Sequence, residues 1–299
     1  MKKLFLFLLL ALQLPLNAGI KDAINHHDVK LAITENRQYS VNIAITAIFR
    51  DEARFLKEWI DFHRLIGVER FYLYNNLSCD DYAAVLAPYV AAGIVTLVEW
   101  PHESIGLGDW NNIQTTAYRD AMNRARIEKV RWLAVIDVDE FIVPTIHHTL
   151  TDLLEEHRHA CAVRVNWVFF GTSHVTEIPK NKLMIEMLTR NSGYVGESQG
   201  YKAILHTGRC ETAGPHDGLY NDGFAPIWLP YATAQINHYW SRDEKHFYQV
   251  KVPRRIKLNQ SVATSEEWVD NWNKEIPEAA LPIQCYIHDL RLLMGMPNE

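Results

Sequence analysis

Three acidic residues stand within four positions directly after an apolar segment. Asp137, Asp139 and Glu140 follow residues 134–136, which are typical of a buried strand. Side chains two positions apart in an extended segment point the same way, so we expect Asp137 and Asp139 to converge. Their mutual repulsion would raise one carboxyl pKa unless a cation lies between them. Carboxylate oxygens suit Mg²⁺ or Mn²⁺ bound with a diphosphate, so the motif predicts a divalent-cation site.

The chain before this motif alternates between strand-like and helix-like segments. We expect strands at 41–49, 71–74, 94–100 and 132–136, and helices at 56–66, 82–92 and 113–126. Asp51 is a residue type that caps the first of these helices. Strands that alternate with amphipathic helices imply βαβ units. The expected fold is therefore α/β and Rossmann-like, with a mostly parallel sheet flanked by helices.

Ligands of such sheets bind outside the carboxyl ends of the strands. The residues that directly follow the expected strands are 50–52, 75–76, 101–102 and 137–140. The C-terminal half, beyond Phe141, is richer in aromatic residues and glycine, and we expect a loop-rich region that shapes an acceptor pocket. There Trp167, Phe169 and Phe170 are able to stack on a sugar, with burial in the core as the alternative for at least two of them.

Composition and charge narrow the function. The 299 residues are 48% hydrophobic and 22% charged, as in a globular protein with one large domain. A net charge of −6 gives no global field for nucleic acid, so we expect none as a partner. A local basic run contains Lys245, Lys251, Arg254, Arg255 and Lys257. We expect one or two of them, Lys251 first, to neutralise the diphosphate that would be bound with the cation. We expect the rest to form a solvated face.

The N-terminus has the layout of a secretory signal. Two lysines precede the apolar run 4–16, and small residues follow at 17–18. The run is short for a membrane span, although a short anchor is the alternative. We therefore expect a signal or anchor at 1–18, a lead-in segment at 19–40 and one catalytic domain at 41–299. This layout predicts a periplasmic, secreted or secretory-pathway location.

The four cysteines do not indicate a zinc site. Cys79, Cys161, Cys210 and Cys285 are widely spaced and form no Cys-x-x-Cys pair. Export would allow disulfides, and buried free thiols are the equal alternative.

Several segments together resemble glycosyltransferase family 92. The motifs are Ile48 to Glu52 with Leu56 to Trp59, His63 with Gly67, Phe71 to Asn76 with Ser78 and Asp80, Trp132 to Pro144, and more thinly Ile236 to Ser241 followed by Lys251. The resemblance implies a GT-A fold and a nucleotide-sugar donor, with a UDP-sugar favoured. It also implies that Asp137 and Asp139 hold Mn²⁺ or Mg²⁺.

The same resemblance suggests further site residues. His238 matches a late histidine that serves related families as a metal or diphosphate ligand, and His216 competes with it. Around the donor we expect Arg50, Glu52, Asn75, Asp80 and Lys251. Asp51 stands where Asn is common and Asn75 where Asp is common, but an amide still hydrogen-bonds to a base or ribose.

The predicted reaction is transfer of a hexose, galactose by resemblance, to a glycan or lipid-linked acceptor. Direct displacement with inversion needs a base, for which Asp217 and Glu140 are the candidates. A lipid-linked acceptor would bring peripheral membrane association. One alternative is a non-catalytic carbohydrate-binding protein on the same fold. Another is a phosphatase of the haloacid dehalogenase type, although these carry Asp-x-Asp on the first strand and Thr or Val where this chain has Phe141.

Overall fold

The computed structural model of the protein describes residues 37–193, 200–260, 262–275 and 281–297. One compact unit covers Gln38–Glu299. The expected signal or anchor at 1–18 and most of the lead-in segment lie outside the described residues, so export stays a prediction. Within the described ranges, no helix is both long and apolar enough to cross a membrane.

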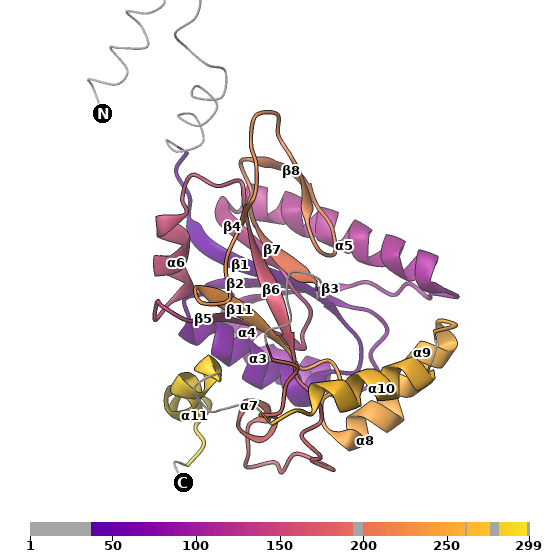
Figure 1. Ribbon diagram of the computed structural model, residues 1–299. Coiled ribbons are helices and arrows are strands. Elements are labelled where there is room, and N and C mark those ends of the chain that lie inside the picture. The colour runs from indigo at the N-terminus through magenta and orange to yellow at the C-terminus, as the bar shows by residue number, and fades with distance from the viewer. Residues whose placement is uncertain (1–36, 194–199, 261, 276–280, 298–299) are drawn as a thin grey trace, which may run out of the picture. The chain divides into compact units, whose positions relative to one another are not determined.

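A mostly parallel sheet forms the centre of this unit (Figure 1). On one side it contains β3 (Val95–Glu99), β2 (Arg70–Asn75), β1 (Val41–Phe49) and β4 (Val130–Val135), in that order and all parallel. It continues with β7 (Tyr201–His206), β6 (Ala162–Phe169), β11 (Ala234–His238) and β5 (Glu140–Pro144). Strand β7 is antiparallel to both neighbours and β5 is antiparallel to β11, whereas β11 and β6 are parallel. The expected α/β class with a mostly parallel sheet is confirmed.

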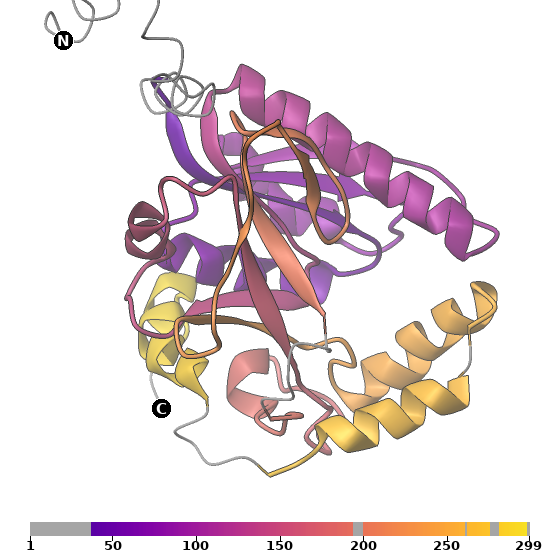
Figure 2. The same ribbon diagram turned by 45° about the horizontal axis from the view of Figure 1, so that its top comes forward.

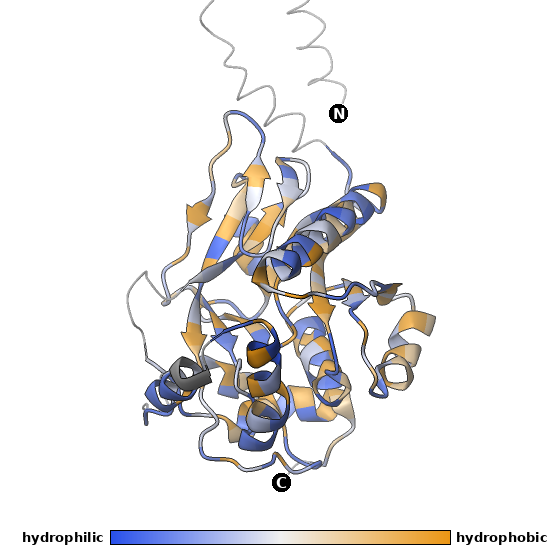
Figure 3. Cartoon of the chain, turned by 90° about the vertical axis from the view of Figure 1, so that its right-hand side faces the viewer, coloured by the Kyte–Doolittle hydropathy of each residue, from blue (hydrophilic) through white to orange (hydrophobic). Residues whose placement is uncertain are grey.

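Helices cover both faces of the sheet. Helix α5 (Leu107–Ile127) lies on one face, and α3 (Ala53–Leu65) and α4 (Tyr82–Ala91) lie on the other (Figures 1 and 2). Successive side chains of β1 point to opposite faces of the sheet and contribute to two hydrophobic cores. Ile45 and Ala47 pack in the core that contains Trp59 of α3, and Ala44 packs in the core that contains Tyr118 of α5. The helices carry both hydrophilic and hydrophobic residues, as helices with one face on a sheet must (Figure 3).

Shorter elements complete the C-terminal half. Two strands, β8 (Cys210–Ala213) and β9 (Gly218–Tyr220), form a separate antiparallel pair, and β10 (Ile227–Trp228) pairs with β6. The helices are α6 (Leu150–Glu156), α7 (Met184–Met187), α8 (Glu244–His246), α9 (Val252–Lys257), α10 (Val262–Trp272) and α11 (Ile287–Met294). A π-helical turn at Phe247–Lys251 connects α8 to α9, and a 3₁₀ turn at Pro282–Tyr286 precedes α11.

The link from β4 to β5 requires a curled sheet. Only residues 136–139 connect these strands, although β7, β6 and β11 lie between them in the sheet. Extended chain covers about 3.3–3.6 Å per residue, whereas each strand spacing is about 4.7–4.9 Å. Four spacings in a flat sheet would exceed the reach of this link. The curl therefore places the acidic motif where the ends of β4, β5 and β11 meet.

Two local expectations were wrong. The helix expected at 113–126 begins earlier, at Leu107. Asp51 is not a helix cap, because Glu52 occupies the cap position of α3 and makes no side-chain capping bond. Asp51 instead has a φ of 54° and its carboxylate accepts from the backbone N–H of Cys79. All four cysteines are free thiols, and Cys161 and Cys210 are buried.

Candidate active site

A pocket of about 630 Å³ opens at the carboxyl ends of β1 and β4. Its walls come from the end of β1, the first turns of α5, the 137–139 link, the end of β11 and the segment 249–258. Six of the residues expected at the site line it: Arg50, Glu52, Asp137, Asp139, His238 and Lys251. The sheet edge that parallel topology assigns to ligands is therefore where these side chains gather.

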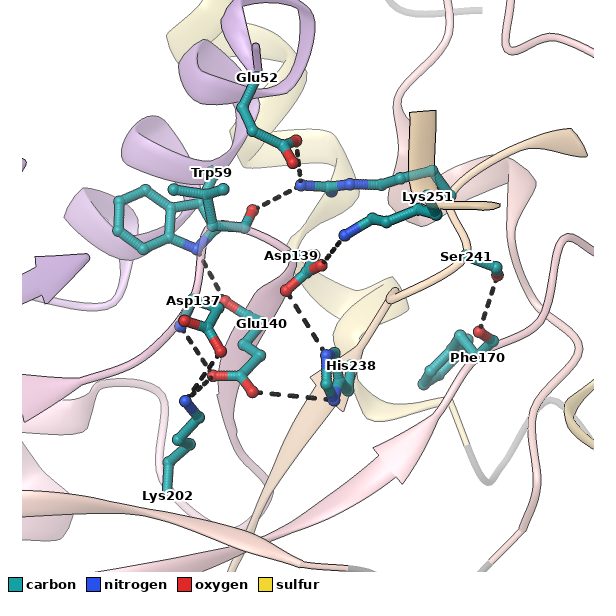
Figure 4. Close-up of polar contacts among 12 residues, drawn as sticks. Glu52, Trp59, Asp137, Asp139, Glu140, Phe170, Lys202, His238, Ser241 and Lys251 are labelled. Atoms are coloured by element: carbon teal, nitrogen blue, oxygen red, sulfur yellow. Dashed lines mark hydrogen bonds and ion pairs between the residues drawn. The ribbon is translucent and has the colours of Figure 1, made fainter. Parts of the chain in front are cut away.

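Asp139 lies at the centre of the site between a lysine and a histidine. Its Oδ2 accepts from Lys251 Nζ at 2.6 Å, and its Oδ1 lies 3.5 Å from His238 Nε2 (Figure 4). Burial opposes ionisation of this carboxyl group, but Lys251 and His238 outweigh it and hold the pKa of Asp139 well below its usual range. Burial also lowers the pKa of His238. The centre therefore presents a carboxylate beside a neutral imidazole.

Asp137 is paired with a lysine that the sequence did not single out. Lys202, on β7, is 2% exposed and donates to Asp137 Oδ2 at 2.8 Å and to the Pro215 carbonyl at 2.9 Å. Burial by itself lowers the pKa of Lys202, but Asp137 and Glu140 outweigh it and raise that pKa. Tyr118 of α5 donates to the other oxygen of Asp137 at 3.3 Å. Side chains from β7 and from α5 thus hold this carboxylate in place.

Glu140 is completely buried and does not line the pocket. Its Oε2 accepts from the backbone N–H of Asp137 at 2.8 Å and lies 3.6 Å from Lys202 Nζ. Burial raises the pKa of Glu140 well above its usual range, and the nearby Asp137 and Asp139 add to that shift. A carboxyl group without exposed surface cannot take a proton from an acceptor in the pocket. The position of Glu140 therefore gives no support to its expected role as the catalytic base.

The residues present fit a divalent cation in part. The expected trio of Asp137, Asp139 and His238 does not converge, and within the described ranges no three His, Cys, Asp or Glu side chains form a metal cluster. The reason is that Lys202 pairs with Asp137. Asp139 Oδ1 and His238 Nε2 do face each other at 3.5 Å in the pocket. Mg²⁺-type sites commonly combine one or two carboxylates with substrate phosphates, so Asp139 supplies the ligand type that such a site needs, with the His238 imidazole beside it.

A buried arginine holds the acidic motif against the start of α3. Arg242 is fully buried and donates to the Val138 carbonyl at 2.8 Å and to Glu52 Oε2 at 3.1 Å. Its guanidinium also lies 4.2 Å from the ring centroid of Phe55. The planar group makes these contacts together, which a lysine ammonium is not shaped to do. Arg242 therefore fixes the backbone between Asp137 and Asp139.

We expect Arg242→Lys to lower the free energy of unfolding by about 1–3 kcal/mol, because a buried hydrogen-bonded partner is left unsatisfied. Urea unfolding of the full-length protein would measure the change. Arg255→Lys is the control, since this partly exposed arginine contacts Trp240 and Trp268 instead. An equal loss in both variants would contradict a specific role for Arg242.

The expected donor residues differ in their surroundings. Arg50 and Glu52 line the pocket, and Arg254 of α9 donates to the Arg50 carbonyl. Asn75 is buried outside the lining, where it donates to Glu99 at 2.7 Å and accepts from the Ser78 N–H at 3.0 Å. Asn76 lines the pocket in its place. The structure thus gives Asn75 a supporting role.

Asp80 is likewise outside the pocket lining, and it stabilises the start of α3. Its Oδ2 accepts from the Ala53 N–H at 2.7 Å. Asp217 is also outside the lining. Arg164, Tyr201 and Tyr220 donate to its carboxylate, together with the Gly218 N–H. Because its oxygens are already occupied, the structure does not support Asp217 as a base.

The candidate histidines and aromatic residues also differ in their positions relative to the pocket. His238 lines the pocket, whereas the competing His216 is exposed outside it and contacts the Tyr201 carbonyl at 3.2 Å. Phe170 is buried in the core, and Trp167 and Phe169 pack against the His238 ring with centroid distances of 4.9 Å. Sequence patterns missed Lys202 and Arg242, and they missed the pocket residues Trp110 and Gln114 of α5.

These features define a class of protein: an α/β protein with a pocket beside an acidic centre at the carboxyl edge of its sheet. A comparison with known families is more specific. The model of glycosyltransferase family 92 matches residues 39–280. The chain therefore belongs to glycosyltransferase family 92, and the expected class of glycosyltransferase is confirmed at the level of the family.

Curated relatives agree with this assignment. A glycosyltransferase family 92 protein of Oryza sativa subsp. japonica is 28% identical over 249 residues, which cover 80% of this chain and 38% of the relative. One of Ricinus communis is 27% identical over 241 residues, which cover 78% of this chain and 40% of the relative. The chain thus spans about two fifths of the length of these relatives.

Solved structures show more distant similarity. S. aureus TarS 1-349 in complex with UDP-GlcNAc has a TM-score of 0.36 and 12% identity, over 76% of this chain and 69% of that one. Another structure of S. aureus TarS 1-349 has a TM-score of 0.39 and 11% identity, over 77% of this chain and 70% of that one. At these scores we draw no functional conclusion from the similarity.

Proposed function

We propose that the protein is a metal-dependent glycosyltransferase that moves a hexose from a nucleotide-sugar donor, UDP-linked in the first instance, to a glycan or lipid-linked acceptor. The observation that carries the proposal is the pairing of Asp139 and His238 in the pocket of a family 92 chain. Galactose as the hexose, and Mn²⁺ or Mg²⁺ as the cation, follow from the resemblance of the motifs.

Each side chain has a defined part in this proposal. Asp139 and His238 would hold the cation, which when bound neutralises charge on the leaving diphosphate. Lys251 pairs with Asp139 at 2.6 Å and lies in the same wall of the pocket as Arg254. The positively charged side chains of both residues can therefore turn to diphosphate oxygens. Asp137 accepts one bond at each oxygen but is 29% exposed and lines the pocket, so it can accept further bonds from ribose hydroxyls. Transfer would be a direct displacement by the acceptor hydroxyl, whose base we leave unassigned.

The test is calorimetric titration of the full-length protein with UDP, with and without Mn²⁺, followed by GDP. We expect binding of UDP that requires the cation. Binding of neither nucleotide would overturn the proposal and favour a carbohydrate-binding protein. Release of phosphate from sugar phosphates would favour the phosphatase alternative.

We expect Lys251→Met to weaken Mn²⁺-dependent UDP binding about 10- to 100-fold, because a hydrogen bond to a charged group contributes about 1.5–3 kcal/mol. The matched control is Lys245→Met, which removes a lysine of the same basic run that pairs with Glu177 outside the pocket. Calorimetry would give both dissociation constants. Unchanged or tighter binding in Lys251→Met would contradict a role for Lys251 at the diphosphate.

A further inference from the structure

His238 lies between the carboxyl groups of two consecutive residues, Asp139 and Glu140 (Figure 4). Its Nε2 lies 3.5 Å from Asp139 Oδ1, and its Nδ1 lies 3.7 Å from Glu140 Oε1. Within the described part of the chain, neither that Nδ1 nor that Oε1 has a hydrogen-bond partner of normal length. Both side chains are buried. In the described structure the two atoms therefore face each other without a competing hydrogen bond.

The strand register creates this pair. Strands β11 and β5 are antiparallel, and His238 is directly opposite Glu140. On the other side, β11 is parallel to β6, where Phe169 is the partner of His238. Directly opposed side chains on neighbouring strands lie on the same face, with Cβ atoms about 4.5–5.5 Å apart. The backbone alone thus brings the carboxyl group and the imidazole together.

Packing leaves the His238 ring few orientations. Phe169 stacks on it at 4.9 Å with an interplanar angle of 30°, and Trp167 packs at 4.9 Å with an angle of 52°. Between such neighbours the main alternative is a half turn about the Cβ–Cγ bond, which exchanges the nitrogen and carbon positions. That turn would place carbon atoms against both carboxyl groups. It is unfavourable because it would remove the polar contacts between the two ring nitrogens and the two buried carboxyl groups.

Glu140 is itself fixed and cannot reach a ligand in the pocket. The backbone N–H of Asp137 donates to its Oε2, and Lys202 lies 3.6 Å from the same oxygen. Its side chain has no exposed surface and is absent from the pocket lining. Any influence of Glu140 on the pocket must therefore pass through a neighbour.

We propose that Glu140 is a positioning residue that holds His238 with its Nε2 directed at Asp139 and the pocket. A hydrogen-bonding partner at the far nitrogen is a common means of fixing a metal-binding histidine, and here the Glu140 carboxyl group lies at that position. The role of His238 as a ligand rests on the proposed function. The orientation of its ring, by contrast, is a property of the protein without ligands.

A double-mutant cycle tests whether Glu140 acts through His238. Glu140→Ala, His238→Ala and the double variant would be compared by calorimetric titration of the full-length protein with UDP and Mn²⁺. We expect Glu140→Ala alone to weaken binding about 10- to 100-fold. In the His238→Ala background the same change should weaken binding by less than about twofold, since the ring through which Glu140 acts is already absent. Equal losses in both backgrounds, or none in either, would overturn the proposal.

A second measurement needs no ligand and separates this proposal from the proposed function. The ¹⁵N signals of the His238 ring, assigned by their loss in His238→Ala, would be compared between the wild type and Glu140→Gln. This variant preserves the side-chain volume and an oxygen that can accept from the Asp137 N–H. We expect the Nδ1 signal to move. An unchanged signal would overturn the orienting role. If the wild type binds no nucleotide but its Nδ1 signal differs from that of Glu140→Gln, only the proposed function is refuted.

Discussion

Asp139→Asn is expected to abolish Mn²⁺-dependent binding of UDP and to lower the rate of UDP release from a UDP-hexose by about 10³-fold, the upper range for loss of one electrostatic contact to developing charge. The amide keeps the shape of the side chain but removes the negative charge. Lys251 then loses its 2.6 Å partner, and His238 Nε2 loses the carboxylate it faces at 3.5 Å. Calorimetry and a UDP-release assay would measure the two effects.

The control for this variant is Asp289→Asn, which changes an exposed aspartate in the first turn of α11, outside the pocket lining. It should bind UDP as the wild type does. Circular dichroism of both variants would show that the fold is preserved. If Asp139→Asn retained cation-dependent binding, the cation would have to lie elsewhere, and the pairing of Asp139 with His238 would lose its meaning for catalysis.

The second large effect is loss of stability in acid, caused by His63. Burial lowers the pKa of His63 to about 3, although its bond to the Trp59 carbonyl acts in the other direction. The ring lies 2.8 Å from that carbonyl through Nδ1, and its Nε2 accepts from the Ile142 N–H at 3.2 Å. Both nitrogens are thus used by the neutral ring. Protonation would destroy the second bond.

The direction of the pH dependence follows from these pKa values. Between pH 6.5 and about 3 the unfolded chain binds a proton at His63 that the folded chain does not bind. The stability from this residue is therefore fully present above pH 6.5 and is lost as the pH falls towards 3. One pKa unit corresponds to about 1.4 kcal/mol, so the loss is about 4–5 kcal/mol across this window. Burial also lowers the pKa of His246, to about 2, which adds in the same direction.

Urea unfolding at a series of pH values between 7 and 4 would measure this loss. His63→Gln should flatten the curve, because an amide can donate to the Trp59 carbonyl and accept from the Ile142 N–H without titrating. His288→Gln, which changes an exposed histidine, should leave the curve unchanged. The same slope in the wild type and His63→Gln would show that acid sensitivity arises at other groups.

The parts of the fold that depend on local pattern were predictable. Strands β1, β2, β3 and β4 are apolar runs with turns at their ends. The bounds of β1 are those expected, and the bounds of the other three differ by one or two residues. Helix α5 was underestimated because its first turn contains Gly108, which disfavours helix on propensity alone. Asp51 has the residue type of a cap, but bonds to Ser78 and Cys79 from a distant loop give it another conformation.

The same distinction between local and distant residues applies to the site. Asp137 and Asp139 form a local motif after a strand, so the sequence could place them. Lys202 and Arg242 reach the motif from 65 and 104 residues away, and neither carries a local signal of its partner. Asp217 appeared free in the sequence because nothing there showed that Arg164, 53 residues earlier, would occupy it. Residues that line one surface from separate strands require the topology before their roles can be assigned.

The strand order also has a consequence for folding kinetics. Strand β11 lies between β6 and β5, so its residues 234–238 must enter between strands whose sequences come some 65 to 100 positions earlier. Contacts between such distant segments form slowly, because loop closure costs entropy before the contact stabilises the chain. His238 is the last residue of β11. We therefore expect the acidic centre to gain its histidine late in folding, after the local Asp-x-Asp turn has formed.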